Sequence, residues 1–154
     1  MYDAQTGPNI YLIGSLKNPA VPEFGFWLRS QGFNVFDDWF APGPEADAFW
    51  RKFEVLRGHT YIQALQCEAA ENAFQFDKRH LDQCDGAVLL GPAGKSGHME
   101  LGYVSGRGLP AWVLLPAEPA DWDLMYKLMS GIFLNRSELA HAMRRHFKME
   151  TENA

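Results

Sequence analysis

Apolar residues in this chain fall into short continuous runs that are separated by longer, mixed segments. The runs cover residues 9–13, 33–36, 86–90, 111–115 and 132–134. Their length and continuity predict strands that are buried on both faces. Such strands are typical of a parallel sheet with helices on each side.

The segments between the runs carry apolar residues at helical spacing. They predict helices over residues 22–31, 46–56, 61–80 (with one break), 98–105, 122–130 and 137–147. Strands that alternate with helices predict an α/β fold, a flavodoxin- or Rossmann-like doubly wound sheet of about five parallel strands. We expect a single domain over residues 1–154, with its core at about 9–147.

In a sheet of this kind, ligands bind beyond the carboxyl ends of the strands, at the topological switch point. Three polar corners are predicted there: Gly14-Ser15, Asp37-Asp38-Trp39 and the loop from Gly91 to Gly97. One of the two aspartates could meet a ligand. Trp39 could form an aromatic wall for a flat ligand.

Composition narrows the class of protein. The chain is 47% hydrophobic and 21% charged, which indicates a globular protein, and its net charge of −5 disfavours a polymeric nucleic acid as partner. No apolar run approaches the roughly 20 residues that span a bilayer, so no membrane is expected. Cys67 and Cys84 lack metal-ligand spacing and a disulfide-rich context, which favours a reduced, cytoplasmic protein. The five histidines show no ligand spacing, so neither a metal nor a cofactor is expected.

The loop around Lys95 looks at first like a phosphate loop. A Walker A loop needs a glycine five residues before its Gly-Lys pair, and this chain has Leu89 there, inside a strand. A weaker interpretation stays open, in which Gly94, Ser96 and Gly97 precede a helix N-terminus that favours anions or oxygen-rich ligands. The alternative is a plain strand-to-helix turn capped by Ser96.

Glu100 lies in the first turn of the expected helix. A carboxylate there is commonly explained by the helix dipole alone. In a crevice at the strand ends it could instead act as a nucleophile or as an acid/base. Asp77, near the end of a helix rich in aromatic residues, has a solvated role as its default.

Four segments in order carry a resemblance to a known family. They are IYLIGS at 10–15, DKRHLDQCD at 77–85, SGHMELGY at 96–103 and LMS at 128–130. On these segments the chain resembles the nucleoside 2-deoxyribosyltransferase-like superfamily. This group includes the transferases and the 2′-deoxynucleoside 5′-monophosphate N-glycosidases.

The resemblance implies three catalytic residues. Glu100 matches the glutamate that attacks the anomeric carbon and forms a covalent glycosyl-enzyme. Asp77 matches the acid that assists the departing base, and Tyr11 matches the tyrosine that holds the nucleophile in position. This division suits the chemistry, since cleaving an N-glycosidic bond builds positive charge on the sugar and negative charge on the base.

The resemblance also implies binding residues. Gly14 and Ser15 would line the base or sugar pocket, and Ser96 and Gly97 would contact the 5′ end of the sugar. A further pair, Met129 and Ser130, matches a segment that reaches the site of a neighbouring subunit, which implies a homodimer or a larger homo-oligomer.

The chain departs from the transferases in the loop before Glu100. They carry an acidic residue there for the sugar 5′-hydroxyl, whereas this chain has Gly94-Lys95-Ser96. A lysine and open backbone suit a phosphate better.

The sequence therefore predicts an enzyme that cleaves the N-glycosidic bond of a 2′-deoxynucleoside or its 5′-monophosphate. The deoxyribosyl group would pass to another base or to water, and a small nucleoside or nucleotide would be the partner. Two alternatives stay open: a non-catalytic nucleotide-binding or sensor module, and an NAD glycohydrolase.

Overall fold

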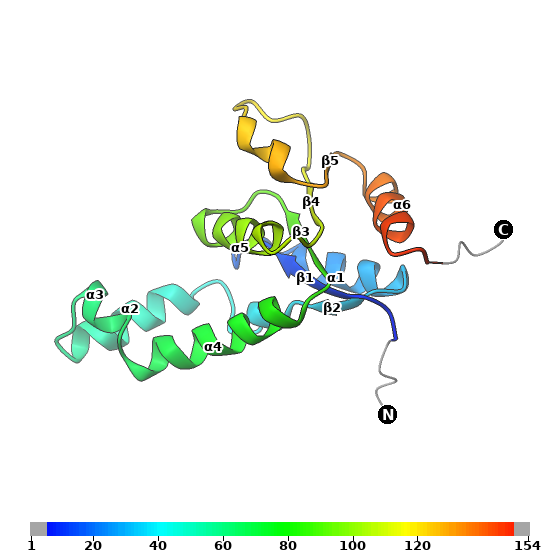
Figure 1. Ribbon diagram of the computed structural model, residues 1–154. Coiled ribbons are helices and arrows are strands. Elements are labelled where there is room, and N and C mark those ends of the chain that lie inside the picture. Colours follow the sequence, from blue (N-terminus) through cyan, green and yellow to red (C-terminus); the bar gives the residue numbers. More distant parts are fainter. Residues whose placement is uncertain (1–5, 150–154) are drawn as a thin grey trace.

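A five-stranded parallel sheet forms the centre of the structure, a computed structural model that describes residues 6–149 (Figure 1). The strand order is β2-β1-β3-β4-β5, and all four pairings are parallel. The strands are β1 (Asn9–Ile13), β2 (Asn34–Phe36), β3 (Gly86–Leu90), β4 (Ala111–Leu114) and β5 (Gly131–Phe133). The predicted doubly wound sheet is confirmed, while residues 1–5 and 150–154 of the expected domain lie outside the described range.

Six α-helices and two 3-10 helices connect the strands within residues 6–149. They are α1 (Val21–Ser30), η1 (Asp38–Phe40), α2 (Ala46–Leu56), α3 (Tyr61–Ala64), α4 (Glu68–Gln83), α5 (Lys95–Gly106), η2 (Leu124–Leu128) and α6 (Arg136–His146). The break expected within residues 61–80 falls between α3 and α4. The helix expected over residues 122–130 is only the short η2.

The prediction for the start of α5 was wrong by one turn. Gly94 is its N-cap, with φ −90° and ψ −156°, and no side chain caps the helix. Ser96 therefore lies inside the first turn and does not cap it. As a consequence, Glu100 belongs to the second turn of α5 and is not at the helix terminus.

The two faces of the sheet have separate apolar cores. Along β1, Ile10 and Leu12 pack into the core beneath α1 and α6. Tyr11 and Ile13 face the opposite way, into the core that α4 and α5 cover. Because side chains alternate along a strand, Tyr11 lies on the same side of the sheet as the helices that carry Asp77 and Glu100.

The switch point of the sheet lies between β1 and β3. β1 pairs with β2 on one edge, through Asn9 and Asn34, and with β3 on the other, where Ile13 lies opposite Leu89. The connections after β1 and β3 therefore leave in opposite directions. This separation opens a crevice beyond the carboxyl ends of these strands, as the sequence predicts.

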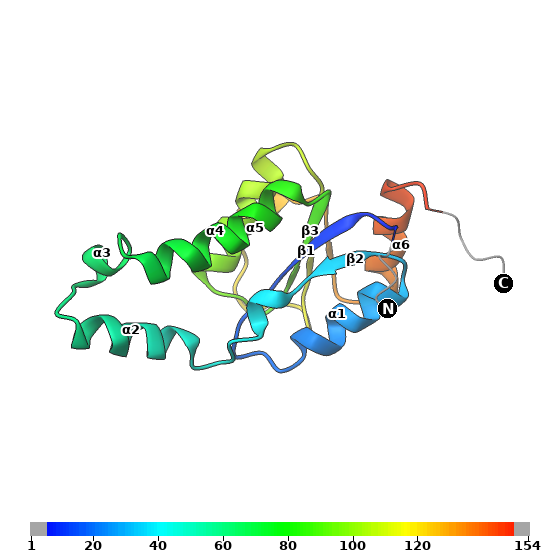
Figure 2. The ribbon, with the colours of Figure 1, turned by 90° about the horizontal axis from the view of Figure 1, so that it is seen from below.

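Residues 46–75 form a helical arm that extends away from the sheet, with α2 and α4 lying side by side (Figure 2). Several large apolar side chains of this arm are exposed, among them Phe49, Phe53, Leu56, Tyr61 and Ile62. The arm therefore has little apolar core of its own. None of the helices described is long and apolar enough to cross a membrane.

We expect Gly97→Ala to destabilise the protein by about 1 kcal/mol or more. A Cβ at Gly97 would lie 2.9 Å from Cγ2 of Ile13, a side chain with little freedom to move. Gly102→Ala in the same helix is the matched control, because its Cβ would meet nothing within 4 Å. We expect that variant to gain up to about 1 kcal/mol through helix propensity. Urea unfolding measures both, and equal effects would contradict the close approach of α5 to β1.

Candidate active site

A cavity of about 560 Å³ opens beyond the carboxyl ends of β1 and β3. It brings together most of the site residues that the sequence predicts, from four segments far apart in the chain. Those that line it are Tyr11, Gly14, Ser15, Trp39, Asp77, Lys95, Ser96, Gly97 and Glu100.

Two predicted residues near the strand ends do not line the cavity. Asp38 is exposed, and its neighbour Asp37 turns toward α1, where its Oδ1 lies 2.6 Å from Nη2 of Arg29. Gly91 is buried against the end of β4, where a Cβ would lie 3.1 Å from Cδ2 of Leu115. Tight packing is therefore enough to explain why a glycine occupies position 91, and no contact with a ligand is needed.

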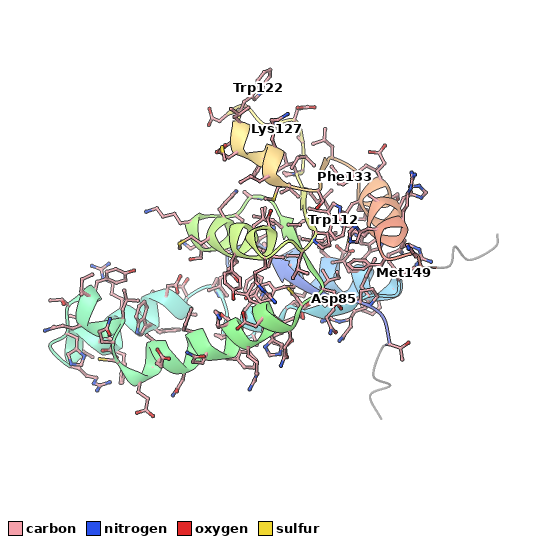
Figure 3. All side chains as sticks on the ribbon, viewed as in Figure 1. Asp85, Trp112, Trp122, Lys127, Phe133 and Met149 are labelled. Carbon is pink, nitrogen blue, oxygen red and sulfur yellow. The ribbon has the colours of Figure 1, made fainter. Side chains whose placement is uncertain are left out.

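Met129 and Ser130 lie at the amino end of β4, away from this cavity. The backbone N–H of Ala111 donates to Oγ of Ser130 at 3.1 Å, and Met129 packs against the core beneath α5. The neighbouring loop presents Trp122 outward, 90% exposed (Figure 3). Their contact with a second subunit, and the oligomer it implies, stays a prediction.

Sequence reasoning missed part of the cavity wall. Leu16 and Lys17 continue the β1 corner, and a second wall comes from the start of the helical arm: Pro44, Glu45, Asp47 and Ala48. The Pro42-Gly43-Pro44 loop before α2 is the sequence feature that could have indicated this wall, because such turns change the direction of the chain just before a helix. No local pattern shows that this bend returns toward β1.

Tyr11 stands at the floor of the site. Its side chain is 1% exposed, and its hydroxyl makes no hydrogen bond of normal geometry with any described residue. Burial raises the pKa of this phenol far above its usual range, and the nearby Glu100 carboxylate raises it further. The hydroxyl is therefore a neutral donor held close to Glu100.

Glu100 projects from α5 into the cavity. Burial raises the pKa of this carboxyl from 4.5 to about 7; the Tyr11 hydroxyl opposes that shift and the charge of Asp77 adds to it. A carboxylate that is poorly solvated and lacks a cationic partner is reactive, because little stabilises its charge. At neutral pH both the protonated and the ionised form are therefore populated.

Asp77 enters the same cavity from α4. Burial raises the pKa of its carboxyl, and the neighbouring His80 opposes that change. His80 is held by a stacked contact with Phe36, their ring centroids 3.7 Å apart. A raised pKa makes a carboxyl group easier to protonate, and a protonated carboxyl group can donate a proton.

The first turn of α5 forms the other end of the cavity. Lys95, Ser96 and Gly97 line it there, and the N-cap residue Gly94 offers no side-chain acceptor for their backbone N–H groups. Open N–H groups at the positive end of a helix favour an anion or an oxygen-rich group. The anion-binding interpretation rests on these N–H groups and stays a prediction.

Trp39 supplies a flat wall. Its Nε1–H donates to the carbonyl oxygen of Leu12 at 2.7 Å, which holds the indole at the end of β1. Ser15 is also held in place, because its Oγ accepts from the backbone N–H of Lys17 at 3.1 Å. The cavity thus combines an aromatic surface, a partly buried pair of carboxyl groups and a helix start with open backbone N–H groups.

Comparison with known proteins supports this architecture. No protein-family model matches the chain, and no curated protein sequence does. A 2-deoxyribosyltransferase from Bacillus psychrosaccharolyticus superposes with a TM-score of 0.61 and 18% identity, over 86% of this chain and 90% of that one. The chain shares the fold of that enzyme.

A second solved structure is similar as well. The CMP N-glycosidase BcmB of Clostridium botulinum superposes with a TM-score of 0.51 and 12% identity, over 90% of this chain and 98% of that one. The predicted resemblance is therefore confirmed for the fold. At these identities the chemistry has to be argued from the cavity itself.

We expect Glu100→Gln to stabilise the protein at about pH 8 by up to about 3 kcal/mol, and to do so much less at about pH 5. The pKa of Glu100 is raised from 4.5 to about 7 on folding, so the native state binds the extra proton. The resulting stability is present below the unfolded pKa and is lost as the pH rises through about 7.

Chemical denaturation across this pH range measures the effect. Glu118→Gln, on an exposed loop, is the control and should show no such gain at high pH. A pH-independent difference between wild type and Glu100→Gln would contradict a partly buried carboxyl that binds a proton on folding.

Proposed function

We propose that this chain is a nucleoside 2-deoxyribosyltransferase-like enzyme that cleaves the N-glycosidic bond of a 2′-deoxynucleoside or its 5′-monophosphate. The observation that carries the proposal is the convergence of Tyr11, Asp77 and Glu100 in one crevice at the switch point of the sheet. The fold that the chain has in common with a 2-deoxyribosyltransferase and a CMP N-glycosidase supports it.

Glu100 acts as the nucleophile. Its carboxylate oxygen forms a bond to the anomeric carbon while the bond from that carbon to the base nitrogen breaks, and the electron pair of that bond leaves with the base. Because the carboxylate is poorly solvated, its charge is available to the positive charge that develops on the sugar. The neutral Tyr11 hydroxyl lies close to this carboxylate and lowers its pKa, and in the substrate complex it would orient the carboxylate by donating a hydrogen bond to it.

Asp77 supplies the proton that the departing base needs. Burial raises the pKa of its carboxyl, which makes the protonated, donating form easier to reach than for a solvated aspartate. In the second step, a water molecule or another base attacks the anomeric carbon and releases Glu100. Asp77 accepts a proton from that attacking group, which completes the cycle.

The corner at the start of α5 binds the 5′ substituent. Lys95, Ser96 and the open backbone N–H groups there suit a phosphate. No carboxylate lies within residues 91–97, whereas Glu45 and Asp47 line the opposite wall. We therefore propose a 5′-monophosphate as the preferred form of the substrate.

We expect Glu100→Ala to lower turnover by about 10³-fold or more, since it removes the nucleophile. Base exchange between deoxyinosine and adenine, together with release of free base from a panel of deoxynucleotides and from NAD, measures this loss. Glu118→Gln should retain wild-type rates. Mass spectrometry of wild type quenched during turnover should locate a deoxyribosyl adduct on Glu100.

Equal rates for wild type and Glu100→Ala on every substrate would overturn the catalytic proposal. Tight nucleotide binding without turnover would favour a sensor module. Nicotinamide release from NAD, without cleavage of deoxynucleotides, would favour a glycohydrolase of that cofactor.

We expect Lys95→Ala to raise KM for deoxynucleoside monophosphates about tenfold or more, because it removes a charge-assisted contact to phosphate. KM for the corresponding nucleosides should change by less than about twofold, since they lack the phosphate. Steady-state kinetics on matched nucleoside and monophosphate pairs measures both. An equal rise for the two substrates would contradict phosphate binding at this corner.

A further inference from the structure

A second group of reactive side chains lies on the helical arm, outside the cavity described above. Glu54 near the end of α2, His59 in the following turn and Cys67 at the start of α4 place one ligand atom each within 4.8 Å of the others. Glu54 is only 2% exposed and is the one charged residue that is buried among residues 6–149. A carboxylate in that position needs strong partners.

The contacts within this group converge on one atom. Nδ1 of His59 lies 2.6 Å from Oε2 of Glu54 and 3.5 Å from Sγ of Cys67. A nucleophile, imidazole and carboxylate that relay a proton use two different ring nitrogens. The arrangement is therefore no catalytic relay, but its three potential ligand atoms all lie within 4.8 Å of one another, which is close enough for them to share one ion.

We propose that Glu54, His59 and Cys67 bind a zinc ion. Carboxylate oxygen, imidazole nitrogen and thiolate sulfur are the three ligand types that zinc takes in proteins. Bond lengths of about 2.0–2.3 Å in a tetrahedral site separate sulfur from nitrogen by about 3.6 Å and nitrogen from oxygen by about 3.4 Å. The first separation is already present, and the second requires His59, which is on a turn and 28% exposed, to move outward.

The neighbours of the three residues decide which of their atoms a metal could use. Nη1 of Arg57 lies 3.3 Å from Oε1 of Glu54, so Oε2 remains for the metal. Cys67 is the N-cap residue of α4, and its Sγ lies 3.3 Å from the carbonyl oxygen of Gln63. Burial and the Glu54 carboxylate raise the pKa of this thiol, so a metal would bind it by displacing its proton. A cavity of about 510 Å³, lined by Glu54, His59 and the indole of Trp50, provides room for a fourth ligand such as water.

The metal would act as a structural clip. It joins the end of α2 to the start of α4, across an arm whose large apolar side chains are mostly exposed. Small units with little core commonly depend on such a cross-link. The same two helices carry Asp47 and Asp77 into the active-site cavity, and Cys67 is about 15 Å from Asp77 along α4. The ion would thus stabilise a wall of the cavity from outside it.

The sequence predicts no metal because the spacing of these residues matches no common ligand motif. They are five and eight residues apart, and the end of α2, a turn and the whole of α3 lie between the first and the last of them. The zinc proposal stands on the arm alone and does not depend on the proposed enzymatic activity.

The test uses the full chain, reduced and freed of metal with a chelator, and titrated with cobalt(II) or zinc(II). We expect one ion per chain and, for cobalt, a thiolate-to-metal charge-transfer band with the intense visible bands of a tetrahedral site. Zinc should raise Tm. Cys67→Ala should show neither the charge-transfer band nor the rise in Tm. Its affinity for zinc should be lower by about tenfold or more. His59→Gln should weaken zinc binding by a similar factor.

Cys84→Ala is the matched control, because Cys84 is the other cysteine and is buried at the far end of α4. It should bind both metals as wild type does. Absence of binding to wild type, or unchanged binding by Cys67→Ala, would overturn the proposal. If Cys67→Ala does not fold, X-ray absorption of zinc-loaded wild type decides, since one sulfur at about 2.3 Å is expected and its absence refutes the site.

Discussion

Burial of β1 on both faces is the constraint on which the rest of the structure depends. The strand pairs with β2 and β3 and is covered by α1 on one side and by α4 and α5 on the other. A shift of one residue in its register would exchange the two faces. Tyr11 would then turn toward α1 and away from Asp77 and Glu100. The apolar neighbours of Tyr11 hold it on the side where the carboxyl groups lie.

The crevice at the end of this strand has a cost in stability. Two carboxyl groups share a partly buried cavity, and burial raises the pKa of both. The Tyr11 hydroxyl, buried beneath them, has no ideal hydrogen-bond partner in the described chain. A protein that needed only stability would not retain such an arrangement, since each group would be better placed in water or paired with a cation.

The helical arm also contains a carboxyl group whose burial has a cost in stability. A buried carboxylate, Glu54, is held by His59 and Arg57 in a region that has few apolar contacts. One wall of the active-site cavity comes from the start of this arm, through Glu45 and Asp47. Because α2 belongs to both, a change in how the arm is packed would also change the shape of the cavity.

The sequence by itself determined the sheet, its strands, and the two corners at Gly14 and Gly97, because continuous apolar runs and glycine turns are local signals. It did not determine where α5 begins, since Gly94 caps that helix without a side chain. Only the tertiary structure brought Asp47 of α2 to the cavity, left Asp38 outside it, and gathered Glu54, His59 and Cys67. The physical reason is the same in each case. These positions depend on how segments far apart in the chain pack against one another. A short stretch of sequence carries no signal for such long-range packing.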